Sequence, residues 1–153
     1  MSREEFEKIV EEEFPRAVPE KFHTLIKNVG FLIEDEPDEE TRRENGLRDD
    51  ETLLGLYRGI SHVNRGEYYG VGATLPDTIT LYQLPLEDEA EHILRSQKGQ
   101  TEGKTWTSAP ERTPDGLFGE AVRKAVRETI WHEVAHYFGY DEEQVQDREE
   151  RGI

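Results

Sequence analysis

The stretch VRETIWHEVAHYFGYDEEQV, residues 126–145, contains the pattern that decides the fold. His132 and His136 are four residues apart, so on an α-helix they lie one turn above the other on the same face. Two imidazoles in this arrangement can share one metal ion, and zinc accepts nitrogen ligands readily. The segment therefore predicts a helix that carries a pair of metal ligands.

The sequence on both sides of the histidines supports this helix. Apolar residues keep helical spacing from Phe118 to Phe138, and after Gly119 no glycine or proline interrupts them. Gly139 stands three residues after His136, where a helix can end in a left-handed turn. We therefore predict a long helix over 118–138 that ends just after the histidine pair.

Glu133 directly follows His132 and is rotated from it by about 100° around the helix axis. It cannot readily bind the same metal, but it can reach a water molecule bound there. We therefore predict that Glu133 is a general base. The fourth coordination position of a catalytic zinc is left open for that water.

A third metal ligand is expected after the turn. A chain that turns at Gly139 can bring a residue about three positions later back to the metal, and Glu142 occupies that position. Asp141 and Glu143 flank it and could take its place. The chain has no cysteine, so any zinc must rest on histidine and carboxylate ligands.

The other three histidines, His23, His62 and His92, are isolated in the sequence. Such residues are usually surface or packing histidines. We expect no metal at any of them.

The N-terminal residues predict a pair of helices. Ser2 and Glu5 form a capping box before apolar residues at helical spacing, and Pro15 is expected to end or bend that helix. A second helix is predicted from Pro19 until Gly30 stops it.

Strands are predicted in the middle of the chain. They cover 31–33, 53–60 and 78–83, and residues 34–51 are interpreted as a loop. Gly55 permits a bulge or a close backbone approach. The strand at 78–83 is expected to border the cleft and to pair with an extended peptide substrate.

Two segments separate that strand from the motif helix. Residues 86–94 predict a short helix after Pro85, and residues 96–116 predict a long loop or flap over the site. Tyr57 and Tyr82 are aromatic candidates for substrate contact. The whole pattern predicts one α+β domain over residues 1–153.

Composition limits the partners. The chain has 35 acidic and 19 basic residues and a formal charge of −16, which repels nucleic acid. It has no apolar run long enough to span a membrane, and its acidic N-terminus is unlike a signal peptide. We therefore expect a cytoplasmic protein without a nucleic-acid or membrane partner; the oligomeric state is left open.

The spacing His-Glu-x-x-His-x-x-Gly-x-x-Glu over 132–142 resembles the small bacterial zincin-like metallopeptidases. The segments IEDEPDEE (33–40), LLGLYRGI (53–60) and LPDTITLYQLPLE (75–87) are similar to that family's segments in the same order. The resemblance covers roughly residues 4–145. It implies a minimal zincin fold, in which a small mixed sheet packs on the active-site helix and a short C-terminal helix follows the metal turn.

The resemblance also implies a zinc cofactor and a peptide or protein substrate. The family usually carries aspartate where this chain has Glu142, and its loop corresponding to 96–116 is usually shorter. Full metzincins add a methionine turn beneath the metal, whereas the only methionine here is Met1. The leading hypothesis is a zinc-dependent peptidase, with Glu133 as base and with His132, His136 and Glu142 as ligands.

Two other functions are compatible with the sequence. The chain could be a non-catalytic metal-binding or interaction domain that retains a zincin site. It could also be a metal-free acidic protein that holds a basic partner, although this reading leaves the motif unexplained.

Overall fold

The computed structural model describes residues 1–23, 26, 29–59, 77–98, 111–139, 143, 144 and 147. Its helices and strands occur in the following order: α1 (Arg3–Ala17), α2 (Glu20–His23), β1 (Val29–Glu34), α3 (Glu39–Glu44), β2 (Gly55–Arg58), β3 (Asp77–Tyr82), α4 (Gln83–Lys98) and α5 (Gly116–Tyr137). This combination of helices and strands belongs to the α+β class that the sequence predicts.

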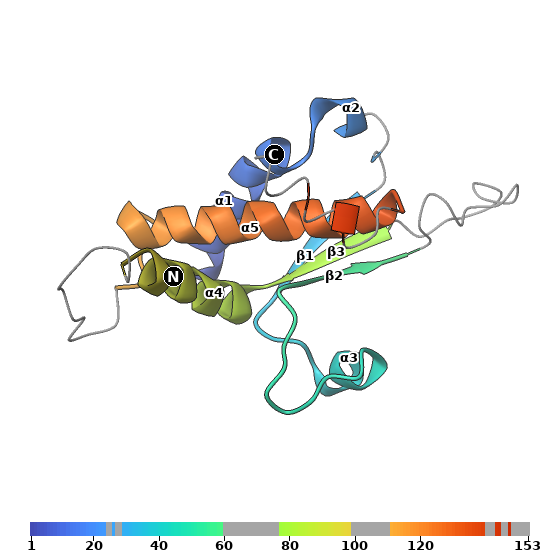
Figure 1. Cartoon of the computed structure of the whole chain (residues 1–153), viewed down its shortest axis with the longest axis horizontal. Helices are drawn as coiled ribbons and strands as arrows, with labels where there is room; N and C mark the ends of the chain where they lie inside the picture. Colours follow the sequence, from blue (N-terminus) through green and yellow to red (C-terminus); the bar gives the residue numbers. More distant parts are fainter. Residues whose placement is uncertain are drawn as a thin grey trace, which may run out of the picture.

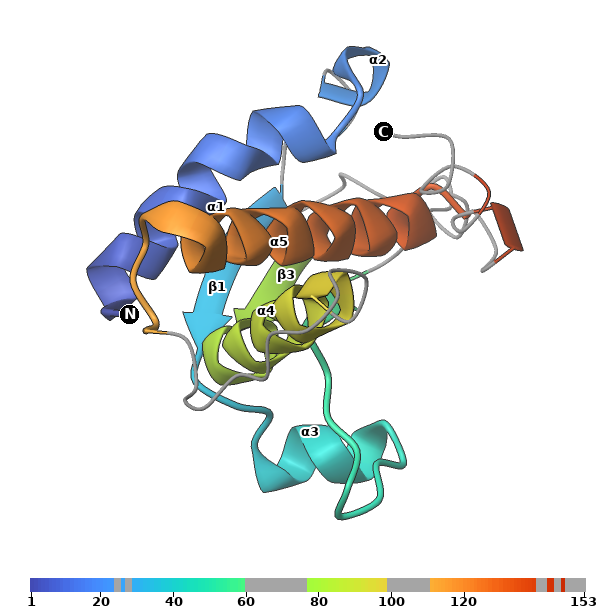
Figure 2. The ribbon, with the colours of Figure 1, turned by 60° about the vertical axis from the view of Figure 1, so that its left-hand side comes forward.

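The three strands form one mixed sheet in the order β1-β3-β2. β1 runs parallel to β3, with Val29 opposite Asp77, and β2 runs antiparallel to β3, with Gly55 opposite Leu81. Helix α5 crosses the sheet and lies between α1 and α4 (Figure 1; Figure 2). The motif helix is therefore flanked by helices on two sides, and it contacts β2 through Thr129 and Glu133 in its C-terminal half.

Helix α5 supplies much of the core. Trp131, Ile130, Val126 and Val122 are fully buried. They belong to one apolar cluster with residues of α1, β3 and α4. Burial of this many large side chains is the main reason why α5 has a fixed position on the sheet.

The N-terminal helices agree with the sequence only in part. The capping box is present, because Ser2 Oγ accepts the Glu5 N–H at 3.1 Å and Glu5 Oε2 accepts the Ser2 N–H at 2.8 Å. Helix α1 does not end at Pro15 but continues to Ala17, whose burial with Val18 in the core holds the last turn.

The prediction of one helix from Pro19 to Gly30 is wrong. Helix α2 ends at His23, and Val29 and Gly30 begin β1, where they lie opposite Asp77 and Thr78 of β3. Pairing with the central strand outweighs the helical spacing of the apolar residues in this segment.

Residues 34–51 are not a continuous loop, because α3 lies within them. Asp38 caps this helix by accepting the Thr41 N–H at 2.7 Å. Acidic residues fill its first turn and basic residues its last, which suits the helix dipole. These signals were present in the sequence.

The strand predicted at 78–83 is β3, which covers Asp77–Tyr82. It is the central strand, and both of its edges are paired. A substrate peptide cannot add to it, so the predicted substrate role of this strand is wrong. Tyr82 is fully buried and is excluded as a substrate contact.

Helix α4 starts at once after β3 and is longer than predicted. It runs from Gln83 to Lys98, and Pro85 lies in its first turn, where a missing N–H costs no hydrogen bond. The predicted loop therefore begins later than residue 96. Residues 99–110, which include most of the predicted flap, lie outside the described residues.

Among the described residues, no helix is long and apolar enough to cross a membrane.

Candidate active site and metal centre

The three motif residues lie on the last two turns of α5. The rings of His132 and His136 are neighbours, with centroids 4.7 Å apart and planes at 77° to each other. Both side chains are half-buried. The predicted placement of the two imidazoles on one helix face is therefore confirmed, and their nitrogen donors suit zinc.

The helix ends where the sequence predicts. Phe138 is the C-cap, and its N–H lies 3.2 Å from Val134 O and 3.1 Å from Ala135 O. Gly139 follows with a φ of 77°, in the left-handed region that favours glycine. The chain therefore turns directly after the second histidine.

Asp141 and Glu142, the two leading candidates for a third ligand, lie outside the described residues. Glu143 is exposed, and it has helical backbone together with Gln144 and Asp147, where a short C-terminal helix is expected. Among the described residues there is no group of three His, Cys, Asp or Glu side chains that could hold a metal.

Strand β2 positions the Glu133 carboxylate. The Tyr57 N–H donates to Glu133 Oε2 at 3.0 Å. Leu54 is bonded to β3, since its carbonyl accepts the Tyr82 N–H at 3.0 Å. Because bonded and non-bonded pairs alternate in an antiparallel ladder, the N–H of Tyr57 points away from β3 and toward the helix.

Helix α5 approaches β2 closely at Gly55. A Cβ on this residue would lie 2.7 Å from Thr129 Cγ2 and 3.4 Å from Glu133 Cγ. The close backbone approach that the sequence permitted at Gly55 is therefore present. Without it, the Glu133 carboxylate could not reach the backbone of β2 in this geometry.

Tyr57 also organises the neighbouring side chains. Its hydroxyl donates to Oδ2 of the buried Asp77 at 2.5 Å, and its ring packs edge-on against Tyr137, with centroids 5.5 Å apart. The sequence named Tyr57 for substrate contact, whereas its backbone and hydroxyl here connect β2 to α5 and β3. The link to Glu133 had no signal in the sequence.

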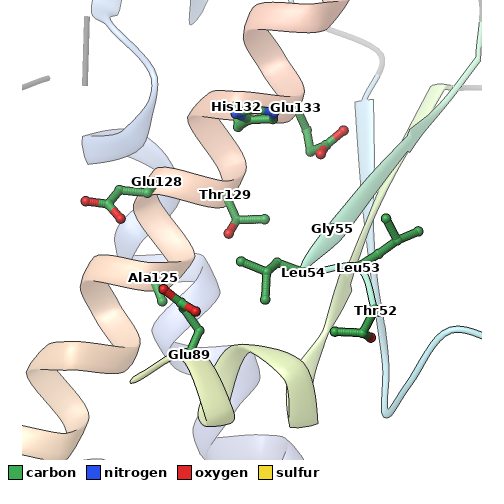
Figure 3. Close-up of a pocket in the computed structure, with 10 residues that line it drawn as sticks. All are labelled: Thr52, Leu53, Leu54, Gly55, Glu89, Ala125, Glu128, Thr129, His132 and Glu133. Atoms are coloured by element: carbon green, nitrogen blue, oxygen red, sulfur yellow. The ribbon is translucent and has the colours of Figure 1, made fainter. Parts of the chain in front are cut away.

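A cavity of about 340 Å³ opens beside the motif and is shown in Figure 3. His132 and Glu133 line one end of it, and Leu53, Leu54 and Glu89 contribute from the segment before β2 and from α4. Sequence reasoning missed Glu89, because nothing in the pattern of α4 shows which of its acidic residues approaches α5.

Two of the other three histidines, His23 and His92, are described, and neither lines the cavity beside the motif. His23 and His92 are exposed, and His23 Nε2 lies 2.6 Å from Val18 O. These two positions agree with the expectation of surface histidines. His62 lies outside the described residues.

A helix with two histidines one turn apart and an adjacent glutamate, packed on a small mixed sheet, is the arrangement of zinc-dependent hydrolases. The family model described as zincin-like metallopeptidase matches residues 26–98 and 118–152, and the chain belongs to this family. The matched residues include the motif and every candidate for the third ligand. No curated protein was found to match the chain.

Proposed function

We propose that this protein is a zinc-dependent peptidase in which Glu133 is the general base. One observation carries the proposal: the rings of His132 and His136 are neighbours, and His132 and Glu133 line a cavity that could receive substrate. Family membership supports the same reaction class. Hydrolysis of a peptide bond needs these parts together.

His132 and His136 are the residues that would hold the zinc ion, and Glu142 is the proposed third ligand, with Asp141 as the alternative. When bound, zinc would lower the pKa of a water molecule to about 7 and polarise the substrate carbonyl. Negative charge from a carboxylate ligand strengthens metal binding.

Glu133 moves the protons. Its carboxylate takes a proton from the attacking water and returns it to the leaving nitrogen. The Tyr57 N–H fixes the rotation of this carboxylate by binding Oε2. A base whose orientation is fixed before substrate binds does not have to be reordered during the reaction.

The test compares zinc content and peptide cleavage in two variants. Glu133→Gln keeps the shape of the side chain but removes the base, so it should retain about one equivalent of zinc and lose about a thousandfold in kcat/KM. Glu120→Gln is the matched control, since Glu120 is exposed on the same helix, three turns before the motif. It should cleave as the wild type does.

Two other outcomes would contradict the proposed function. Unchanged cleavage by Glu133→Gln overturns the role of Glu133. Zinc at one equivalent without cleavage of any peptide supports a metal-binding or interaction domain instead.

The third ligand is tested separately by zinc affinity. Glu142→Ala should weaken zinc binding strongly, whereas Glu143→Ala should change it little, since Glu143 is exposed. Loss of zinc in Asp141→Ala, with Glu142→Ala unaffected, would assign the ligand to Asp141.

A further inference from the structure

The cavity beside the motif has a mixed wall. Leu53 and Leu54 form an aliphatic side, and Glu89 and Glu128 supply carboxylates in addition to Glu133. Among the described residues that line it, none is a lysine or an arginine. Figure 3 shows the Glu89 side chain extending from α4 toward α5, on the same side of the helix as the site.

Glu89 differs from the acidic residues next to it on α4. Asp88 Oδ1 and Glu91 Oε1 each lie 2.7 Å from a nitrogen of Arg112. Glu87 Oε1 accepts a hydrogen bond from the N-terminal amine at 2.7 Å. Among the described residues, Glu89 has no ion-pair partner, although it is half-buried in the wall of the cavity.

A half-buried carboxylate without a cation favours a ligand that brings one. Lysine and arginine side chains can lay their aliphatic stems on apolar surface while the charged end meets a carboxylate. Here Leu53 and Leu54 offer the apolar surface, and Glu89 offers the carboxylate. An apolar side chain would cover Glu89 without pairing it, and an acidic one would be repelled.

We propose that this cavity receives a lysine or arginine side chain of the substrate, next to the peptide bond that is cleaved. The proposal rests on the proposed peptidase function, because it places the substrate across Glu133. Glu128 contributes from the rim, where its carboxylate lies 3.8 Å from Lys124 Nζ and is exposed to solvent. Glu89 is therefore the main determinant of specificity.

The experiment uses the zinc-loaded full chain and peptides that differ at one position. Lysine, norleucine and glutamate are compared there, since norleucine keeps the aliphatic stem of lysine without its charge. The lysine peptide should have a kcat/KM about tenfold above that of the norleucine peptide, and the glutamate peptide should be the poorest substrate. Added salt should reduce the lysine preference and leave cleavage of the norleucine peptide unchanged.

In Glu89→Gln, the ratio of kcat/KM for the lysine peptide to kcat/KM for the norleucine peptide should be close to one. In Glu89→Lys, the glutamate peptide should be the preferred substrate. Glu11→Gln is the matched control, because it removes the same charge from an exposed position on α1. It should keep the preference of the wild type. Equal cleavage of all three peptides by the wild type, or a preference that survives Glu89→Gln, overturns the proposal.

A binding measurement separates this proposal from the proposed function. Calorimetry on zinc-loaded Glu133→Gln, with and without Glu89→Gln, compares the affinities of the lysine and norleucine peptides. A lysine preference that depends on Glu89, without cleavage by the wild type, would keep the cavity assignment and reject the peptidase. Cleavage without any binding preference would keep the peptidase function and reject the cavity assignment. If neither cleavage nor a binding preference were found, both claims would be rejected.

Discussion

Two glutamate carboxylates lie on different sides of helix α5, Glu13 from α1 and Glu133 from α5 itself, and their surroundings differ. On the side of α1, Glu13 is fully buried, with Arg127 Nη1 2.8 Å from its Oε2 and Arg123 Nη1 3.1 Å from its Oε1. On the side of β2, Glu133 is half-buried and its Oε2 accepts the backbone N–H of Tyr57.

This difference is expected if Glu13 stabilises the fold and Glu133 is the proposed general base. Two arginines neutralise Glu13 and tie α1 to α5, because a buried charge is tolerated only when it is paired. A base has to bind and release a proton, so it needs a fixed orientation and access to substrate. For Glu133, the hydrogen bond from the Tyr57 N–H fixes the orientation, and the cavity provides access for substrate.

The largest stability effect should follow from removing the cations around Glu13. With Arg123→Ala and Arg127→Ala together, Arg16 is the one described cation that remains in an ion pair with this carboxylate; its Nη1 lies 3.5 Å away and its side chain is largely exposed. Unfolding by urea should show a loss of about 3 kcal/mol, because the buried charge is left without adequate pairing. Activity per folded molecule should not change.

The control for this double variant adds Glu13→Leu. If the loss comes from the uncompensated charge, the added leucine should restore much of it, since an apolar side chain suits the buried position. A double variant that keeps its stability but loses cleavage would break the comparison, because the α1 side would then serve the reaction.

A smaller loss of stability is expected from a substitution on the β2 side of α5. In Gly55→Ala the new methyl group meets Thr129 Cγ2 at 2.7 Å, so α5 and β2 must separate or Thr129 must move. We expect a stability loss of about 1–2 kcal/mol. We also expect about a tenfold fall in kcat/KM, because Glu133 would lose its alignment with the Tyr57 N–H.

Two variants sharpen this prediction. Thr129→Ser removes Cγ2, so combining it with Gly55→Ala should recover part of the activity. Gly30→Ala in β1 is the matched control, since a Cβ there has no atom within 4 Å and should leave cleavage unchanged. Full activity of Gly55→Ala would show that the close approach does not position the base.

The sequence predicted the motif side of the molecule better than the sheet. A long helix with regular apolar spacing over 118–138 has a single consistent interpretation, and α5 follows it within two residues. The short strands depend on partners far away in the chain. Val29 continued a helical pattern that Gly30 was expected to stop, yet pairing with Asp77 and Thr78 placed both residues in β1.

The same reason limited prediction of the site. His132, Glu133 and His136 form a local pattern, so their arrangement on the helix followed from spacing alone. The Tyr57 N–H and Glu89 reach the site through tertiary packing of β2 and α4 on α5, which no local pattern encodes. The predicted pairing of the strand at 78–83 with substrate failed for the same reason, since the partners of β3 are distant in the sequence.

The smallest effect concerns Glu12, which shares Arg123 with Glu13 but lies at the surface. Its Oε2 accepts a hydrogen bond from Arg123 Nη1 at 2.6 Å, and this bond lowers the pKa of Glu12 below its ordinary value of 4.5. A carboxyl whose pKa is lower in the folded state stabilises the fold above the unfolded pKa. That contribution disappears as the pH falls through the folded pKa.

Glu12→Gln should therefore be slightly less stable than the wild type at pH 7, with a smaller loss than for the arginine variants, because solvent and salt screen an exposed pair. Urea unfolding at a series of pH values from 7 to about 3 should show the difference shrinking below pH 4.5. Glu11→Gln controls for net charge, because it removes the same charge from the neighbouring exposed position. A difference that persists unchanged at the acidic end, or in high salt, would mean that Glu12 stabilises α1 by packing rather than by its charge. Glu12 could then no longer be compared with Glu13 as a carboxylate that acts through its charge.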